Sequence, residues 1–64
     1  MNFDDFTYEE LIAINALIKN SANHYYVSLR GAGFEPAPEI VEGIMSLRRR
    51  VKKAIHDKLE EQLG

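Results

Sequence analysis

Residues 29–38, Leu-Arg-Gly-Ala-Gly-Phe-Glu-Pro-Ala-Pro, decide the fold because they separate two long helical patterns. Gly33 suits the left-handed position that follows a helix, and Phe34 would then contact Leu29, as in a Schellman motif. The two prolines stop the first helix from continuing, but a proline is favourable in the first turn of the next helix. The stretch therefore predicts a loop over about residues 32–37.

The helix before this loop has a clear start. Thr7 and Glu10 have the spacing of a capping box, in which each side chain accepts a hydrogen bond from the other residue's backbone N–H. Phe6 and Leu11 occupy the positions of a hydrophobic staple around the same first turn. Steps of three and four residues then predict a helix over about residues 8–31, with one apolar stripe. The stripe consists of Leu11, Ile14, Ile18, Ala22, Tyr25 and Leu29.

The helix after the loop is predicted over about residues 38–63, and it also carries an apolar stripe. The stripe consists of Ile40, Ile44, Leu47, Val51, Ala54, Ile55 and the stem of Lys58. The two helices would be roughly 35 and 39 Å long, so they match in length. A short loop makes such helices antiparallel neighbours. We therefore expect an all-α protein whose residues 1–64 form one domain, an antiparallel two-helix hairpin.

Both helices carry more apolar residues than one neighbouring helix can cover. A single neighbour covers only about a third of a helix surface, whereas the apolar arc of the first helix spans more than half of it. Burying the surplus favours pairing two hairpins into a four-helix bundle, with C2 as the expected symmetry. The residues expected at a dimer or partner interface are Tyr8, Ile12, Asn15, Leu17, Tyr26, Val41, Met45, Leu59 and Leu63.

Asn15 lies within this broad apolar face and has two interpretations. It could be a partly exposed side chain at the edge of the interface, which is the commoner situation. Alternatively, it could be a buried polar group that fixes the register between two subunits.

Five basic residues fall close together in the second helix, and they too have two interpretations. They are Arg48, Arg49, Arg50, Lys52 and Lys53. A solvated face with aliphatic stems covering the edge of the core is favoured, because acidic residues surround the cluster. The alternative is an anion site for the phosphates of nucleic acid or of a small nucleotide, with His24 and Tyr26 as stacking groups. The acidic pI of about 5.6 is unlike that of most nucleic-acid binders.

Other short motifs have simpler structural explanations. Packing explains Tyr25 and Tyr26 better than ligand binding does. Gly31-Ala32-Gly33 follows a helix rather than a strand, so it is helix termination and not a phosphate loop. An acidic-aromatic docking tail at residues 3–6 is a minority interpretation, because the staple already accounts for Phe6.

The composition argues against catalysis and against bound cofactors. The chain has no cysteine and two histidines, too few ligands for a zinc site built on those side chains. Neither histidine completes a Glu-x-x-His pattern, and no motif centred on a nucleophilic serine is present. We therefore expect a protein that is not an enzyme and that binds no metal and no cofactor.

The expected function is that of a small, non-enzymatic interaction protein. It would be a homodimer that binds, and in one version inhibits, another macromolecule, in the style of phage or mobile-element accessory proteins. The alternatives are the phosphate-ligand binder and a structural assembly unit of a larger complex. No apolar run is long enough to span a membrane, and the acidic start is unlike a signal peptide, so the cytoplasm is the expected compartment.

Overall fold

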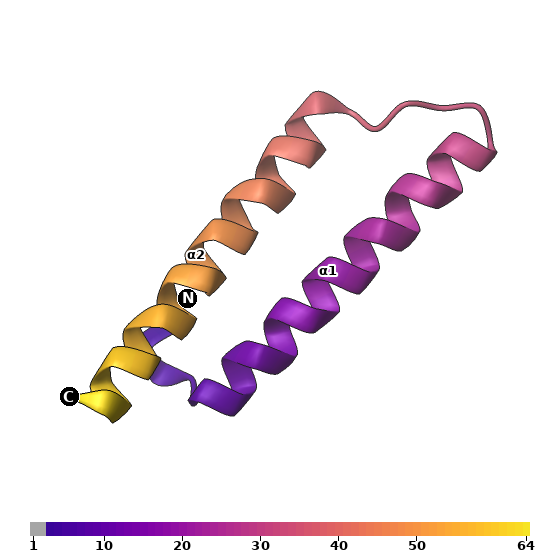
Figure 1. The fold of residues 1–64 in the computed structure, drawn as a ribbon. Helices are drawn as coiled ribbons and strands as arrows, with labels where there is room; N and C mark the ends of the chain where they lie inside the picture. The colour runs from indigo at the N-terminus through magenta and orange to yellow at the C-terminus, as the bar shows by residue number, and fades with distance from the viewer. Residues whose placement is uncertain (1–2) are drawn as a thin grey trace.

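The structure is a computed structural model that describes residues 3–64, and it is a helical hairpin (Figure 1). A short 3₁₀-helix, η1 (Phe3–Asp5), precedes two long helices, α1 (Tyr8–Gly31) and α2 (Pro38–Leu63). The long helices run antiparallel and pack against each other, and the described residues include no strand. The predicted all-α hairpin and the bounds of both helices are confirmed.

The capping box forms at the start of α1. The Thr7 hydroxyl oxygen accepts the Glu10 backbone N–H at 3.1 Å, and the Glu10 carboxylate accepts the Thr7 backbone N–H at 2.8 Å. Thr7 itself has the extended backbone that an N-cap residue requires. Two of the backbone donors that would otherwise lack partners at this terminus are thus satisfied by side chains.

The end of α1 is a Schellman motif. Gly33 has a φ of 86°, and its N–H donates to the Arg30 carbonyl at 3.0 Å. The N–H of Phe34 donates to the Leu29 carbonyl at 2.8 Å, which completes the motif's pair of backbone bonds. The Phe34 side chain remains largely exposed. The stop is therefore made by the backbone, and it depends on the glycine.

The start of α2 is less well capped. Ala37 has the extended N-cap backbone, but alanine has no side-chain oxygen to accept a bond from the first turn. Pro38 is suited to the first helical position because its fixed φ matches the helix and its missing N–H needs no partner. This terminus therefore begins with favourable backbone geometry and without a side-chain cap.

The hydrophobic core is a thin seam between the two helices. Only four of the described residues are buried: Leu11, Ala22, Val51 and Ala54. The hairpin measures 49 × 18 × 17 Å, and its radius of gyration is 14.2 Å, against about 11 Å for a compact domain of this length. The molecule is a rod, and a rod of this width encloses little interior.

Two members of the predicted stripe of α2 are more exposed than expected. Ile40 is 47% exposed and Leu47 is 41% exposed, whereas Val51 of the same stripe is fully buried. Leu47 is turned from the direction of Val51 toward one side of the seam, whereas Ile40 points along that direction but lies in the first turn of α2, at the loop end of the hairpin. The apolar stripe of α2 faces α1, but α1 buries only part of it, around Val51 and Ala54.

The N-terminal segment packs against α2 near the chain ends. The Lys58 ammonium donates to the Asp4 carbonyl at 3.2 Å and also pairs with the Glu61 carboxylate at 3.6 Å. The rings of Phe3 and Phe6 lie 6.2 Å apart. In Figure 1 this segment crosses behind α2, so it adds a little cover to one side of the hairpin only.

Replacing Gly33 with alanine should lower the free energy of unfolding by about 1–2 kcal/mol, because alanine is strained at a positive φ. Gly31 provides a matched control. It is the last residue of α1, and a Cβ there would meet no other atom within 4 Å, so Gly31→Ala should raise the stability by up to about 1 kcal/mol. Urea denaturation at one fixed protein concentration, followed by circular dichroism, measures both. Equal effects of the two variants would contradict the Schellman assignment.

Replacing Ala37 with aspartate should raise the free energy of unfolding by about 1 kcal/mol. The new carboxylate would accept a backbone N–H of the first turn of α2 and would favour the positive end of its dipole. Ala32→Asp, at the other end of the loop, is the control and should bring no such gain. A loss of stability in Ala37→Asp would show that the first turn of α2 is not as described.

Candidate interaction surface

The seam between α1 and α2 divides the hairpin surface into two sides. Leu11 and Val51 are fully buried and mark the direction from each helix to the other, and steps of 100° from them place the remaining residues. The front side carries Tyr8, Ile12, Asn15, Lys19, Tyr26, Arg30, Val41, Met45, Arg48, Lys52, Leu59 and Leu63. The back side carries Ile14, Leu17, Ser21, Tyr25, Leu47 and Ala54.

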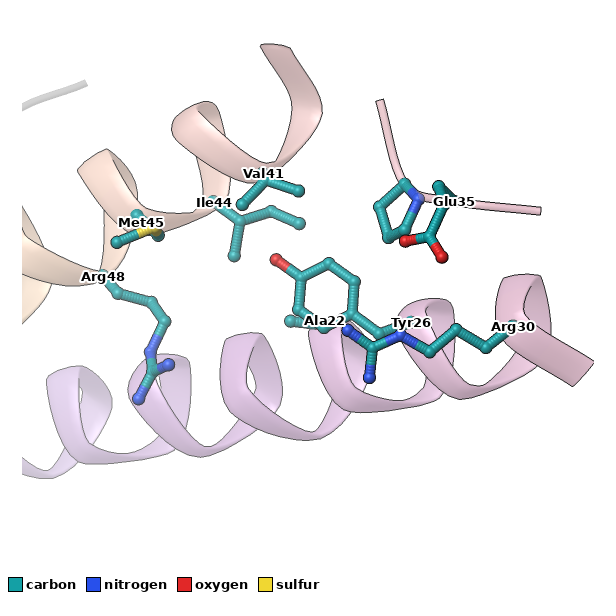
Figure 2. A pocket seen from close by; sticks show the side chains of 9 residues that line it. Ala22, Tyr26, Arg30, Glu35, Val41, Ile44, Met45 and Arg48 are labelled. Atoms are coloured by element: carbon teal, nitrogen blue, oxygen red, sulfur yellow. The ribbon is translucent and has the colours of Figure 1, made fainter. Parts of the chain in front are cut away.

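A groove of about 480 Å³ opens on the front side, toward the loop end of the hairpin (Figure 2). Its apolar lining includes Val41 and Met45 of α2, and the Tyr26 ring reaches across from α1 with its hydroxyl toward α2. Arg30 and Arg48 extend along this opening from opposite helices. The groove thus combines an apolar lining with arginine side chains from both helices.

Two polar atoms of the front side are buried without a hydrogen-bond partner among the described residues. They are the Asn15 side-chain oxygen and the Arg48 Nε. One is an acceptor and the other is a donor. A buried polar group without a partner costs about 1–3 kcal/mol, and more when it is charged. Within the single hairpin, one buried acceptor and one buried donor on the apolar front side therefore lack hydrogen bonds.

A shallower hollow of about 250 Å³ lies on the back side, where Tyr25 and Leu47 help to line it. Figures 1 and 2 show the same side of the hairpin. In both views, a reader who follows α1 from its N-terminus to its C-terminus finds α2 on the left-hand side. The groove in Figure 2 is therefore on the front, whereas η1, which crosses behind α2 in Figure 1, is on the back. The front side is the more open of the two.

The structure gathers eight of the nine predicted interface residues along the front side. Ile12, Met45 and Leu59 are 41%, 48% and 38% exposed, and Leu63 at the C-terminal end is 87% exposed. Leu17 is the exception, because it is 66% exposed but lies on the back side. The predicted set therefore belongs to two surfaces and not to one.

The five basic residues of α2 do not form a single patch. Arg49 pairs with Glu42 at 3.6 Å and Lys53 pairs with Asp57 at 3.2 Å. Arg48 turns toward the seam, and it shares a hollow of about 230 Å³ with Met45, Arg49 and Lys52. Arg50 is exposed and, like Lys52, makes no ion pair within residues 3–64.

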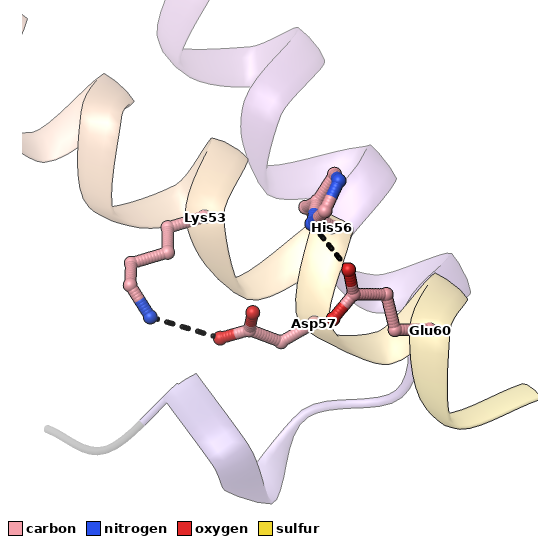
Figure 3. A network of polar contacts seen from close by, with 4 residues as sticks. All are labelled: Lys53, His56, Asp57 and Glu60. Atoms are coloured by element: carbon pink, nitrogen blue, oxygen red, sulfur yellow. Dashed lines mark hydrogen bonds and ion pairs between the residues drawn. The ribbon is translucent and has the colours of Figure 1, made fainter. Parts of the chain in front are cut away.

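A small polar cluster near the C-terminal end of α2 brings a histidine beside two carboxylates (Figure 3). His56 Nδ1 lies 3.6 Å from the Glu60 carboxylate, while Asp57 is bound by Lys53. All of these residues are exposed. Helical spacing accounts for the cluster, since residues four apart share a face of the helix.

The two tyrosines near the end of α1 lie on different sides of the hairpin. The rings of Tyr25 and Tyr26 lie 5.6 Å apart and tilted by 57°, with Tyr25 toward the back hollow and Tyr26 toward the front groove. His24 is exposed and lines neither opening. The structure therefore does not bring His24 and Tyr26 together as one stacking site.

Sequence reasoning did not single out Arg30 and Glu35, which both line the front groove. A signal for Arg30 was available, because it lies four residues after Tyr26 and so shares its side of the helix. Glu35 had no such signal, because its place depends on the path of the loop.

Neither long helix combines the length and the hydropathy needed to cross a membrane, within residues 3–64. Comparison with known protein families, with curated proteins and with solved structures finds no match to this chain.

Proposed function

We propose that this chain is a non-enzymatic interaction protein that works as a homodimer and binds another macromolecule. In this proposal the second copy covers one side of the hairpin, and the partner macromolecule binds apolar surface that the dimer leaves open. The cytoplasm is the compartment in which we expect it to act. The main observation behind this proposal is the large number of exposed apolar side chains on the hairpin.

The size of this surplus matches what a dimer needs. The chain exposes 5014 Å², whereas a compact monomer of 7.3 kDa exposes about 4,200 Å². The difference of about 800 Å² equals the area that each partner buries in a standard protein–protein interface. Nine large apolar side chains are at least 38% exposed, so the exposed surface includes the apolar groups that such an interface would bury.

The two-sided distribution of this surface supports a second binding event. A copy seated on the front side would cover Met45 and Leu59, but it would leave Leu17 and the back hollow beside Tyr25 in water. Exposed apolar patches of this kind are typical of protein interaction sites. We therefore assign the partner macromolecule to the back side.

The polar chemistry of the surface supports binding more than catalysis. The front groove offers Arg30, Arg48, Glu35 and the Tyr26 hydroxyl, and these form no hydrogen-bonded nucleophile and base within the described residues. Arginine and tyrosine are enriched at protein interfaces.

The variant Met45→Glu/Leu59→Glu should convert the dimer to a monomer, because it places four charges inside the paired interface. Sedimentation equilibrium measures the association, and circular dichroism shows whether the hairpin remains helical. Val27→Glu is the matched control, since Val27 is 64% exposed and points away from α2, and it should leave the dimer intact. A wild-type chain that stays monomeric at high concentration overturns the proposal, whereas growth beyond a dimer favours a structural assembly unit.

A second candidate, a binder of phosphate-bearing ligands, is favoured by two exposed cations of the basic cluster, Arg50 and Lys52, which pair with no acidic side chain of residues 3–64. Arg50→Glu/Lys52→Glu should then weaken binding of a fluorescent oligonucleotide or nucleotide by about tenfold, and added salt should weaken it further. Fluorescence anisotropy measures both effects, with Lys19→Glu as a control outside the cluster. Unchanged binding, or no binding at low salt, removes this candidate.

A further inference from the structure

We infer that the second copy packs front side to front side with its long axis reversed, so that Asn15 accepts a hydrogen bond from Arg48 of the other copy. This inference rests on the proposed homodimer and adds the orientation and the central polar contact to it. Charge, unpaired polar atoms and the position of the groove each point to the same arrangement.

Charge is distributed unequally along the rod. The half that holds the chain ends, residues 3–19 and 51–64, carries seven acidic side chains and four basic ones. The half that holds the loop, residues 20–50, carries three acidic and four basic ones. A reversed copy therefore sets a negative half against a slightly positive half, whereas a copy in the same direction sets the two negative halves against each other.

The two unpaired polar atoms are placed for contact between reversed copies. Asn15 lies on the chain-end side of the middle of α1, and Arg48 lies on the loop side of the middle of α2, each within about two helical turns of that middle. Reversal about the middle brings each of them to the level of the other in the second copy. Both point between the seam and the front side, which is where the centre of a four-helix bundle would form.

The contact is also chemically matched. The Asn15 oxygen is an acceptor without a donor, and the Arg48 Nε is a donor without an acceptor. Under C2 symmetry the contact forms twice, so both unpaired atoms of both copies gain a partner. A polar contact of this kind inside an apolar interface fixes register and orientation.

The groove is the third argument. It lies toward the loop end and is lined by Tyr26, Val41 and Met45. Reversal carries Tyr8 and Leu59 of the second copy, which lie on the front side near the chain ends, to the level of this groove. Lys19 and Lys52 also come near the middle, and their long stems allow the ammonium groups to reach solvent at the edge.

The orientation is tested by a distance between identical labels. The chain has no cysteine, so Ala37→Cys gives one spin-label site per copy, at the loop. Reversed copies should give a label–label distance comparable with the 49 Å length of the hairpin, whereas copies in the same direction give one near its 18 Å width. A short distance overturns the inference and leaves the homodimer standing. A monomer at every concentration overturns the proposed function itself.

The polar contact is tested by a double-mutant cycle on the dimer dissociation constant. Asn15→Leu and Arg48→Met should each weaken the dimer by about tenfold, because each leaves the other group buried alone. The double variant should be no weaker than either single one, since it removes both polar groups. Asn20→Leu and Arg50→Met are exposed controls of the same residue types and should change nothing. Additive losses, or no loss in the single variants, would refute the contact.

Discussion

A helix that touches one neighbour can bury only a narrow stripe of its surface, and this geometric limit governs the rest of the hairpin. Leu11 and Val51 lie on the centre line of the contact and are fully buried. Leu47 belongs to the same kind of stripe but remains 41% exposed, and Met45, which points further from α1, is 48% exposed. The chain thus has many apolar side chains and a core of only four residues.

The regularity of the chain ends and turns partly compensates for this small core. The capping box at Thr7 and the Schellman motif at Gly33 satisfy backbone groups that a helix of any composition leaves unpaired at its ends. Such local bonds define where each helix begins and ends, but they add no buried apolar surface. Among the described residues, full burial of apolar side chains is therefore confined to the four residues of the seam.

The front side is also where polar and apolar features are combined. A donor and an acceptor are left unpaired within a face rich in leucine, methionine and tyrosine, and the rod carries opposite charge at its two halves. Each feature is unfavourable or neutral for an isolated hairpin. In the proposed homodimer these features would act together, since apolar area gives affinity while charge and polar pairs select the geometry.

The amino-acid sequence by itself determined the helices, their ends and their antiparallel arrangement, because caps, prolines and apolar periodicity act within a few residues of each position. It also indicated that a single neighbouring helix leaves large apolar side chains exposed, and Leu17 and Met45 are 66% and 48% exposed. Only the tertiary structure decided which side each residue serves: Leu17 falls on the back, Arg48 turns toward the seam, and Arg30 and Glu35 join the groove. Those placements depend on how α1 and the loop lie against α2, and no local pattern encodes that packing.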